Sequence, residues 1–363
     1  MSHPRSTTRT ALLIHSPHAG RARRFSQALA SLREHHITLA GVHSIKDIDL
    51  SAAQGEQWRA RGIDLVIAAG GDGLIGGVLA PVVRSGLPLG ILPLGTANDL
   101  ARTASIPLDL QQAAAVIACG KQIELDLGSA LLSDAPSSQA HYKAAFPAPS
   151  TERLFAHALT VGLNVHFARR ATHPMFRQRY GVFSYPIAVL EAIRAYKPIE
   201  VELRFEGLVT WPQWADRYSA SDAPETVRCR AVQVTVVNAP VFWGSLQATV
   251  PGVSLHDRVL DVVIVEHGRL QHVLLRVLRF FTRRAHRAAK VIGWHANYPT
   301  LLPAALTDIA GVHHVQARAV TIVMGKEQHE VTLDGEISGY TPIAASVAGE
   351  RLRLLVPDTA HIA

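Results

Sequence analysis

The residues best suited to chemistry lie in two turns, each directly after a short apolar run. Residues 70–73 read Gly-Gly-Asp-Gly and follow the run Leu65–Ala69, while residues 95–99 read Gly-Thr-Ala-Asn-Asp and follow Leu89–Leu92. Glycine lets the backbone approach an anion closely and adopt a positive φ, and a helix that starts after such a turn presents unpaired N–H groups. Two such corners in tandem predict a phosphate-binding site.

Polar side chains in the two turns add to this prediction. The Thr96 hydroxyl suits a phosphate oxygen, and the carboxylates of Asp72 and Asp99 suit a hydrated Mg²⁺. An acid placed between glycines favours metal-assisted phosphoryl transfer over simple anion storage. A plainer reading stays open, because Asn98 and Asp99 are also good caps for the helix that follows.

The elements that position these turns alternate between strand and helix. Strand patterns lie at Ala11–Ile14 and Ile37–Val42 as well as in the two runs above, and helix patterns lie at about 21–35, 54–61 and 111–119. Such alternation predicts a mostly parallel sheet with helices on both faces, whose ligands bind at the carboxyl ends of the strands. We assign residues 1–127 to this α/β domain and expect the tail 345–363 to pack back on it.

Residues 128–344 are predicted to form a second, β-rich domain, a sandwich or flattened barrel. Two helices interrupt it, at about 184–195 and 270–290, and two loops, at 133–150 and 207–226, are rich in Ser, Ala and Pro. The strand-like runs are Glu124–Leu127, Phe155–Val161, Val201–Phe205, Ala231–Val237, Val259–Val265, Val315–Val323 and Glu330–Leu333.

The bulk composition limits the class of protein. With 363 residues, 48% apolar and 18% charged, the chain is predicted to be a soluble, folded protein of two domains. Apolar runs stay well below the roughly 18 residues that span a bilayer, so we expect a cytoplasmic location. The net charge of +7 attracts nucleotides, nucleic acid or an anionic membrane, and charge alone does not choose among them. The nineteen histidines are scattered, so no histidine metal site is expected.

Four motifs resemble the diacylglycerol kinase catalytic-domain family, which includes bacterial lipid kinases, sphingosine kinases and ceramide kinases. The first joins the two glycine turns, with residues 93–102 reading PLGTANDLAR, and the second is Asn238-Ala239-Pro240 followed by Trp243-Gly244. The third, residues 257–263, reads DRVLDVV, and the fourth, residues 333–336, reads LDGE. The resemblance covers nearly the whole chain. It implies an α/β domain like that of NAD kinases and phosphofructokinases, followed by a β-rich, sandwich-like domain.

The resemblance also implies roles for residues. Glu336 would be the general base, and Asp334, Asp72 and Asp99 would shape a Mg²⁺ centre for ATP. A structural Mg²⁺ would be held by Asp257 with the backbone carbonyls of Ser254 and Val259. The structural alternative to a catalytic role is that Asp334-Gly335-Glu336 only forms a hairpin turn, since Asp-Gly is a strong turn signal. The implied nucleotide contacts are Gly70, Gly71, Asp72, Gly73, Leu74, Gly95, Thr96, Asn98, Asp99, Pro17 and Gly20.

Three positions depart from the family pattern. Leu74 stands where a threonine is usual, which removes one phosphate hydroxyl, so Leu74→Thr is expected to tighten ATP binding. The first loop keeps Pro17 and Gly20 but lacks its usual asparagine. Arg258 stands where a glycine is usual, beside the implied structural Mg²⁺. An arginine disfavours a neighbouring cation and lacks the backbone freedom of glycine, so that metal site is in question.

The predicted helix 270–290 carries five basic residues at three- and four-residue intervals, which place them on one face. A solvated basic face over an apolar stripe explains the pattern in structural terms. On the functional reading, the face docks on an anionic membrane leaflet. The basic residues are Arg276, Arg279, Arg283, Arg287 and Lys290.

The sequence thus predicts a cytoplasmic kinase that uses ATP and Mg²⁺ to phosphorylate a hydroxyl of a diacylglycerol-like or sphingoid lipid at the membrane surface. We expect a lipid substrate and an anionic membrane as partners, and no nucleic acid; a homodimer stays open. One alternative is a NAD kinase-like enzyme, since that family shares the Gly-Gly-Asp-Gly turn. The other is a catalytically weak or inactive nucleotide- or lipid-binding homologue, which Leu74 and Arg258 suggest.

Overall fold

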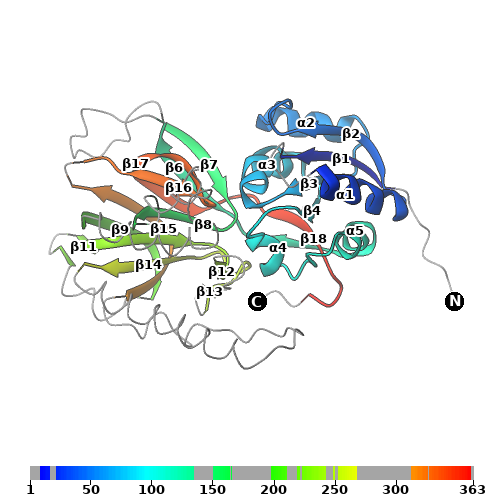
Figure 1. Cartoon of the computed structure of the whole chain (residues 1–363). Coiled ribbons are helices and arrows are strands. Elements are labelled where there is room, and N and C mark those ends of the chain that lie inside the picture. The colour runs from blue at the N-terminus through cyan, green and yellow to red at the C-terminus, as the bar shows by residue number, and fades with distance from the viewer. Residues whose placement is uncertain are drawn as a thin grey trace, which may run out of the picture.

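The computed structural model describes residues 9–16, 22–134, 150–163, 165, 198–210, 219–220, 223–242, 248–249, 252–267, 312–325 and 327–360. These residues form two bodies side by side, each built on its own sheet (Figure 1). The predicted helices at 184–195 and 270–290, Pro17, Gly20 and the Trp243-Gly244 pair lie outside the described residues.

The first body is built on a mixed, mostly parallel sheet of six strands, as the alternating pattern predicts. The strand order is β2-β1-β3-β4-β18-β5, and only β5 runs against its neighbour. Every residue of β3 and β4 is buried, because helices cover both faces of the sheet. Burying one such aliphatic side chain stabilises the fold by about 1.5–3 kcal/mol. The bounds are β1 Thr10–His15, β2 Thr38–Ser44, β3 Leu65–Gly70, β4 Leu89–Pro93, β5 Lys121–Leu125 and β18 Leu352–Val356.

Helices cover this sheet in two pairs. α1 (Ala22–Glu34) packs against α5 (Leu110–Cys119), and α2 (Ala52–Ala60) packs against α3 (Asp72–Ser85). The fifth helix, α4 (Asp99–Thr103), is a short segment after the second glycine turn. From β1 the chain continues to β2 on one side, and from β3 it continues to β4 on the other side. The carboxyl ends of β1 and β3 therefore flank a topological switch point. Ligands of open α/β sheets bind at such points.

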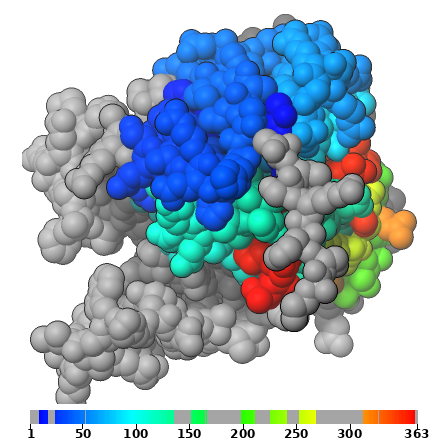
Figure 2. All heavy atoms as spheres, turned by 90° about the vertical axis from the view of Figure 1, so that its right-hand side faces the viewer, coloured from blue at the N-terminus to red at the C-terminus, as the bar shows by residue number. Residues whose placement is uncertain are grey.

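Strand β18, from the last part of the described chain, is inserted into the sheet of the first body. It lies between β4 and β5, parallel to the first and antiparallel to the second, with Leu352 opposite Leu125 and Val356 opposite Lys121. Figure 2 shows this late segment (red) against the blue and cyan surface of the first body. The run Glu124–Leu127, grouped above with the strands of the β-rich half although it lies within residues 1–127, belongs in part to β5 at the edge of the first sheet.

The second body is an antiparallel structure of ten strands that folds back on itself. Strand β14 pairs with both β11 and β15, and β15 pairs with both β9 and β17, so the pairing turns back on itself rather than ending in an open sheet. A small pair, β12 (Val241–Phe242) and β13 (Ala248–Thr249), lies apart. The ten strands are β6 Gly128–Ser133, β7 Ser150–Phe155, β8 Ala158–Gly162, β9 Ile199–Thr210, β10 Ser219–Ala220, β11 Ala223–Val237, β14 Leu260–Glu266, β15 Val312–Met324, β16 Glu330–Leu333 and β17 Glu336–Val347.

Two details of this body differ from the predictions. The run Phe155–Val161 is not one strand, because the chain leaves β7 at Phe155 and enters β8 at Ala158. The predicted loop 207–226 is shorter, since β9 continues to Thr210 and β11 starts at Ala223. Across the described ranges, no helix is long and apolar enough to cross a bilayer.

Candidate active site

The two glycine turns meet backbone to backbone at the carboxyl ends of β3 and β4. A Cβ placed on Gly95 would lie 2.4 Å from the Cα of Gly71, so neither turn has room for a side chain there. The N–H groups of Leu94 and Gly95 both donate to the carbonyl oxygen of Gly70, at 3.0 and 3.2 Å. The two turns therefore form one rigid backbone surface.

The first turn opens directly into α3. Gly71 is the N-cap, and no side chain caps the helix. The Asp72 side chain bonds to α4 instead, where its Oδ1 accepts a hydrogen bond from the Leu100 N–H at 3.1 Å. The positive end of the α3 dipole thus stays available to an anion, as a phosphate site requires.

The second turn is closed by Asn98, which adopts a left-handed conformation with φ 52°. Its Oδ1 accepts from the Gly95 N–H at 3.0 Å, and its Nδ2 donates to the Gly95 carbonyl at 2.9 Å. Both ends of the amide are therefore used within the turn, and Asn98 does not cap α4 through its side chain. Thr96 is exposed, and Asp99 is half-buried at the start of α4.

Leu74 lies in the core of the first body and not at the surface of the turn. It is 5% exposed, and a Cβ placed on Gly70 would lie 2.5 Å from its Cδ2. Its N–H donates to the Gly71 carbonyl at 3.0 Å. Neither the side chain nor the amide is thus free for a phosphate, and the interpretation of Leu74 as a missing phosphate ligand needs correction.

Glu336 comes from the second body and lies against the first glycine turn. A Cβ placed on Gly73 would be 2.9 Å from Oε1 of Glu336. Glu336 starts β17 after a two-residue turn in which Asp334 and Gly335 both have positive φ, 48° and 87°. The hairpin alternative is therefore correct as a description of the backbone, and this turn presents an exposed carboxylate to the N-terminus of α3.

Asp334 sits in the same turn but has a different environment. Its carboxylate accepts three backbone hydrogen bonds, from the N–H groups of Ala156, His157 and Ala158, at 2.8–3.0 Å. Burial raises the pKa of Asp334 to about 6, although the three hydrogen bonds lower it. The negative charge of Asp72 raises it further. The side chain thus holds the turn between β7 and β8 in place.

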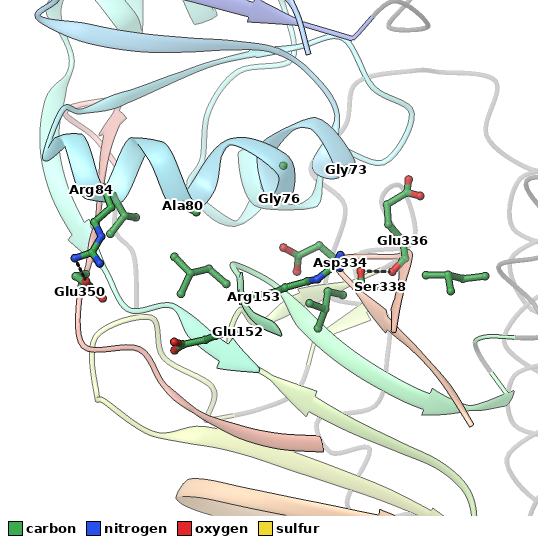
Figure 3. A pocket seen from close by; sticks show the side chains of 15 residues that line it. Gly73, Gly76, Ala80, Arg84, Glu152, Arg153, Asp334, Glu336, Ser338 and Glu350 are labelled. Carbon is green, nitrogen blue, oxygen red and sulfur yellow. Dashed lines mark hydrogen bonds and ion pairs between the residues drawn. The ribbon is translucent and has the colours of Figure 1, made fainter. Parts of the chain in front are cut away.

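A cleft of about 570 Å³ runs from the first glycine turn along α3 (Figure 3). One wall is a face of α3 with small side chains, made by Gly73, Gly76, Gly77 and Ala80, and the opposite wall comes from the second body. The LDGE motif predicts the part of this wall around Glu336, but no motif predicts the part from β7, Glu152–Leu154. It consists of Glu152, Arg153, Leu154, Leu333, Asp334, Glu336, Ile337 and Ser338.

Two family models match this chain in the same order as its two bodies. The diacylglycerol kinase catalytic domain matches residues 10–130, and the YegS C-terminal NAD kinase beta sandwich-like domain matches residues 158–297. The first body therefore carries a diacylglycerol kinase catalytic domain, with the glycine turns inside the matched residues, and a domain of the YegS type follows it.

The similar proteins have low sequence identity to this chain but match it over most of its length. A diacylglycerol kinase of Bacillus subtilis is 25% identical over 92% of this chain and 91% of its own. An uncharacterized Synechocystis protein is 24% identical over 83% of this chain, but the match spans only 57% of that protein. The crystal structure of a diacylglycerol kinase from Bacillus anthracis has a TM-score of 0.60 at 18% identity, covering 98% and 99% of the two chains. That structure supports the fold.

The kinase family implies a catalytic Mg²⁺, and the residues at the two turns fit one. Asp72 accepts from Leu100, which directly follows Asp99, so both carboxylates lie at the start of α4. Mg²⁺ binds through one or two carboxylates together with phosphate oxygens and water. In the described part of the chain, no three His, Cys, Asp or Glu side chains gather to hold a metal alone. A bound ion there would therefore depend on nucleotide phosphates.

Arg258, in the segment of the implied structural Mg²⁺, has the backbone conformation expected of the glycine that is usual there. This residue has φ 60°, the left-handed conformation that a glycine would supply, and its side chain bonds to Asp126 and Ala348 instead of Asp257. Burial raises the pKa of Asp257, and the neighbouring carboxylates of Asp261 and Asp126 act in the same direction. The Asp257 Oδ1 also accepts from the Val259 N–H at 3.1 Å, and a structural Mg²⁺ at this segment stays a prediction.

Proposed function

We propose that this protein is an ATP- and Mg²⁺-dependent lipid kinase that transfers the γ-phosphate to the hydroxyl of a diacylglycerol-like or sphingoid lipid. The observation that carries this proposal is the position of Glu336. Its carboxylate, delivered from the second body, lies against Gly73 in the glycine turn of the first. A base next to a phosphate-binding helix N-terminus is the arrangement that phosphoryl transfer to an alcohol needs.

The chain's own residues divide the work of binding. The backbone at Gly71 and Gly73, together with the uncapped N-terminus of α3, receives the triphosphate, and the exposed Thr96 hydroxyl adds a hydrogen bond. Asp72 and Asp99 would hold Mg²⁺, which when bound neutralises charge on the phosphates. Asp334 fixes the turn that presents Glu336, so it acts by positioning.

Glu336 moves the proton. Its carboxylate accepts the proton of the lipid hydroxyl as the hydroxyl oxygen bonds to the γ-phosphorus. The bond between that phosphorus and the oxygen bridging to the β-phosphate breaks, and ADP leaves with the electron pair. The products are a phosphorylated lipid and ADP, and the proton on Glu336 returns to solvent. The exposure of Glu336 allows this return.

We further propose that the enzyme is cytoplasmic and works at the surface of an anionic membrane. The net charge of +7 favours that surface, and the lipid substrate is found there. The basic face predicted for residues 270–290 lies outside the described residues, and its role stays a prediction.

The test is transfer of labelled phosphate from ATP to mixed vesicles that contain diacylglycerol, ceramide and sphingoid base, in the presence of Mg²⁺. We expect Glu336→Gln to lower the transfer rate by at least about 100-fold, because the amide accepts no proton. The matched control is Glu327→Gln, an exposed carboxylate outside the cleft, which should leave the rate unchanged.

Other results would exclude the proposal or part of it. Equal transfer by the Glu336→Gln variant would remove Glu336 as the base. With NAD added to the same assay, label that enters NAD instead of lipid would favour the NAD kinase-like alternative. Nucleotide binding with no transfer to any acceptor would identify an inactive homologue.

A further inference from the structure

The chain crosses between the two bodies twice, and the two crossings touch. The first crossing is residues 126–127, between β5 and β6, and the second is residues 348–351, between β17 and β18. The Ala348 N–H donates to the Leu127 carbonyl at 2.8 Å. The relative orientation of the two bodies, and with it the approach of Glu336 to Gly73, depends on this pair of segments.

Asp126 carries a buried charge on the first crossing. The residue is 2% exposed, and its two carboxylate oxygens are shared between two arginines. Oδ1 accepts from Arg351 Nε at 2.8 Å, and Oδ2 accepts from the Arg258 backbone N–H, also at 2.8 Å. The Arg258 guanidinium lies 3.6 Å from Oδ1. A carboxylate this buried requires such partners, since losing one leaves an unpaired charge.

Arg258 is the residue that touches both crossings at once. Besides its contacts with Asp126, its Nη1 donates to the Ala348 carbonyl of the second crossing at 2.8 Å. It stands on the loop before β14, and this loop is itself anchored because the Asp126 N–H donates to the Leu255 carbonyl. One side chain thus ties both crossings to the second body.

The same crossing is bonded to the site. Asn238 donates from Nδ2 to the carbonyls of Asp126 and Ala156, at 2.9 and 2.8 Å. Ala156 and its neighbours supply the three N–H groups that hold Asp334. On the other side, β17 runs without a break from Glu336 to Val347, next to the second crossing. Both routes lead from Arg258 to the turn that presents the base.

We propose that Arg258 is a positioning residue, whose guanidinium locks the two crossings and so sets the distance between Glu336 and the phosphate-binding turn. This inference rests on the proposed kinase function for its catalytic consequence and on the hydrogen bonds alone for the lock. The backbone conformation, φ 60°, favours glycine, so the side-chain contacts of Arg258 come with a backbone cost. The substitution Arg258→Gly removes the backbone strain at this position and also removes the guanidinium contacts with Asp126 and Ala348.

The experiment compares wild type, Arg258→Gly, Arg258→Lys and His36→Gly at one fixed Mg²⁺ concentration. His36 is the matched control, since it is exposed on the first body and also has a positive φ, 57°. Three quantities are measured: amide hydrogen exchange in peptides covering 155–158 and 347–349, nucleotide Kd, and kcat for transfer to the mixed vesicles.

For Arg258→Gly we expect exchange in both peptides to rise about tenfold and kcat to fall about tenfold, with nucleotide Kd within twofold of wild type. Arg258→Lys, which keeps the charge, should recover part of kcat, and His36→Gly should behave as wild type. Unchanged exchange in Arg258→Gly would overturn the proposal. So would a parallel loss of nucleotide affinity and of thermal stability, which marks a residue needed only for folding. If wild type transfers no phosphate, the kinase proposal fails, while the exchange data still decide whether the lock exists.

Discussion

Asp334 and Glu336 stand two positions apart in one hairpin turn, yet their carboxylates have different surroundings. Three backbone N–H groups enclose Asp334, whereas Glu336 is exposed and faces Gly73. The resemblance assigned both residues to the reacting centre. Under the proposed function, the exposed carboxylate is the one that reacts and the enclosed one holds the turn.

This difference predicts an acid limb in the pH profile. Burial raises the pKa of Asp334 from 3.8 to about 6, so the carboxyl gains a proton as the pH falls through about 6 and then accepts from its three donors less well. We expect kcat/KM for phosphate transfer to fall below pH about 6, measured from pH 5 to 8. Asp334→Asn should be slow throughout and lack this limb; if the limb persists in that variant, another group causes it.

The raised pKa of Asp334 also determines how the free energy of unfolding changes with pH. The unfolded carboxyl loses its proton near pH 3.8, but the folded one keeps its proton up to about 6. Between these values the folded state binds more protons, so the contribution of Asp334 to the free energy of unfolding decreases as the pH rises through this window.

Leu74 supports a prediction opposite to the one made from sequence. Because its side chain is buried against Gly70, Leu74→Thr would place a hydroxyl in the core without adding a phosphate ligand. We expect the free energy of unfolding to fall by about 2 kcal/mol, with nucleotide Kd unchanged. Val78→Thr, fully buried one turn later in α3, is the matched control for stability. Tighter nucleotide binding by Leu74→Thr would restore the original interpretation.

At the scale of elements, α3 contributes both the uncapped N-terminus beside the first glycine turn and a wall of the cleft. Gly73, Gly76, Gly77 and Ala80 recur at three- and four-residue spacing, so they share one face and leave room for a ligand (Figure 3). Larger side chains at these positions would fill the cleft that separates the helix from the second body.

Ala80→Phe tests this wall. The residue is exposed and lines the cleft, so the ring should occlude the cleft and raise the KM for ATP or for lipid about tenfold without lowering the melting temperature. Ala60→Phe, exposed at the end of α2 and outside the cleft, is the control. Unchanged KM values for both substrates in Ala80→Phe would show that neither uses this part of the cleft.

The elements also show what sequence patterns could predict. Strands β3 and β4 and the turns after them were predictable, because apolar runs before glycines have few other folds available. The break between Phe155 and Ala158 was not, since Ala156 and His157 interrupt the apolar run without any turn residue. That break supplies the donors for Asp334, so the sequence could predict the carboxylates of the site but not what orients them.

At the scale of the molecule, the two bodies could be predicted but the path of the chain between them could not. Near Gly128 the sequence changes from alternating strand and helix patterns to mainly strand patterns, which marks the first crossing. No such change marks the second crossing at residues 348–351. Asp126, Arg258 and Arg351 are far apart in the sequence, and a single chain carries no local sign that they meet.

The position of β18 predicts which fragment of the chain folds. Residues 1–127 alone lack the strand between β4 and β5, so we expect them to aggregate. Leu125 pairs with Leu352 in an antiparallel register, so a short glycine linker from 127 to 350–360 should close a hairpin and restore the sheet. The measurement is cooperative thermal unfolding and nucleotide binding by the fused fragment. Cooperative folding of 1–127 without β18 would show that the strand is dispensable.

Strand β18 also affects the order of events during synthesis on the ribosome. The gap from Leu125 to Leu352 is about 230 residues, roughly 10 to 50 s of translation at ordinary rates. During that time the edges of β4 and β5 have no partner and can pair with other nascent chains. The N-terminal half of this protein is therefore expected to need chaperone protection until its last strand has been made, although it is synthesised first.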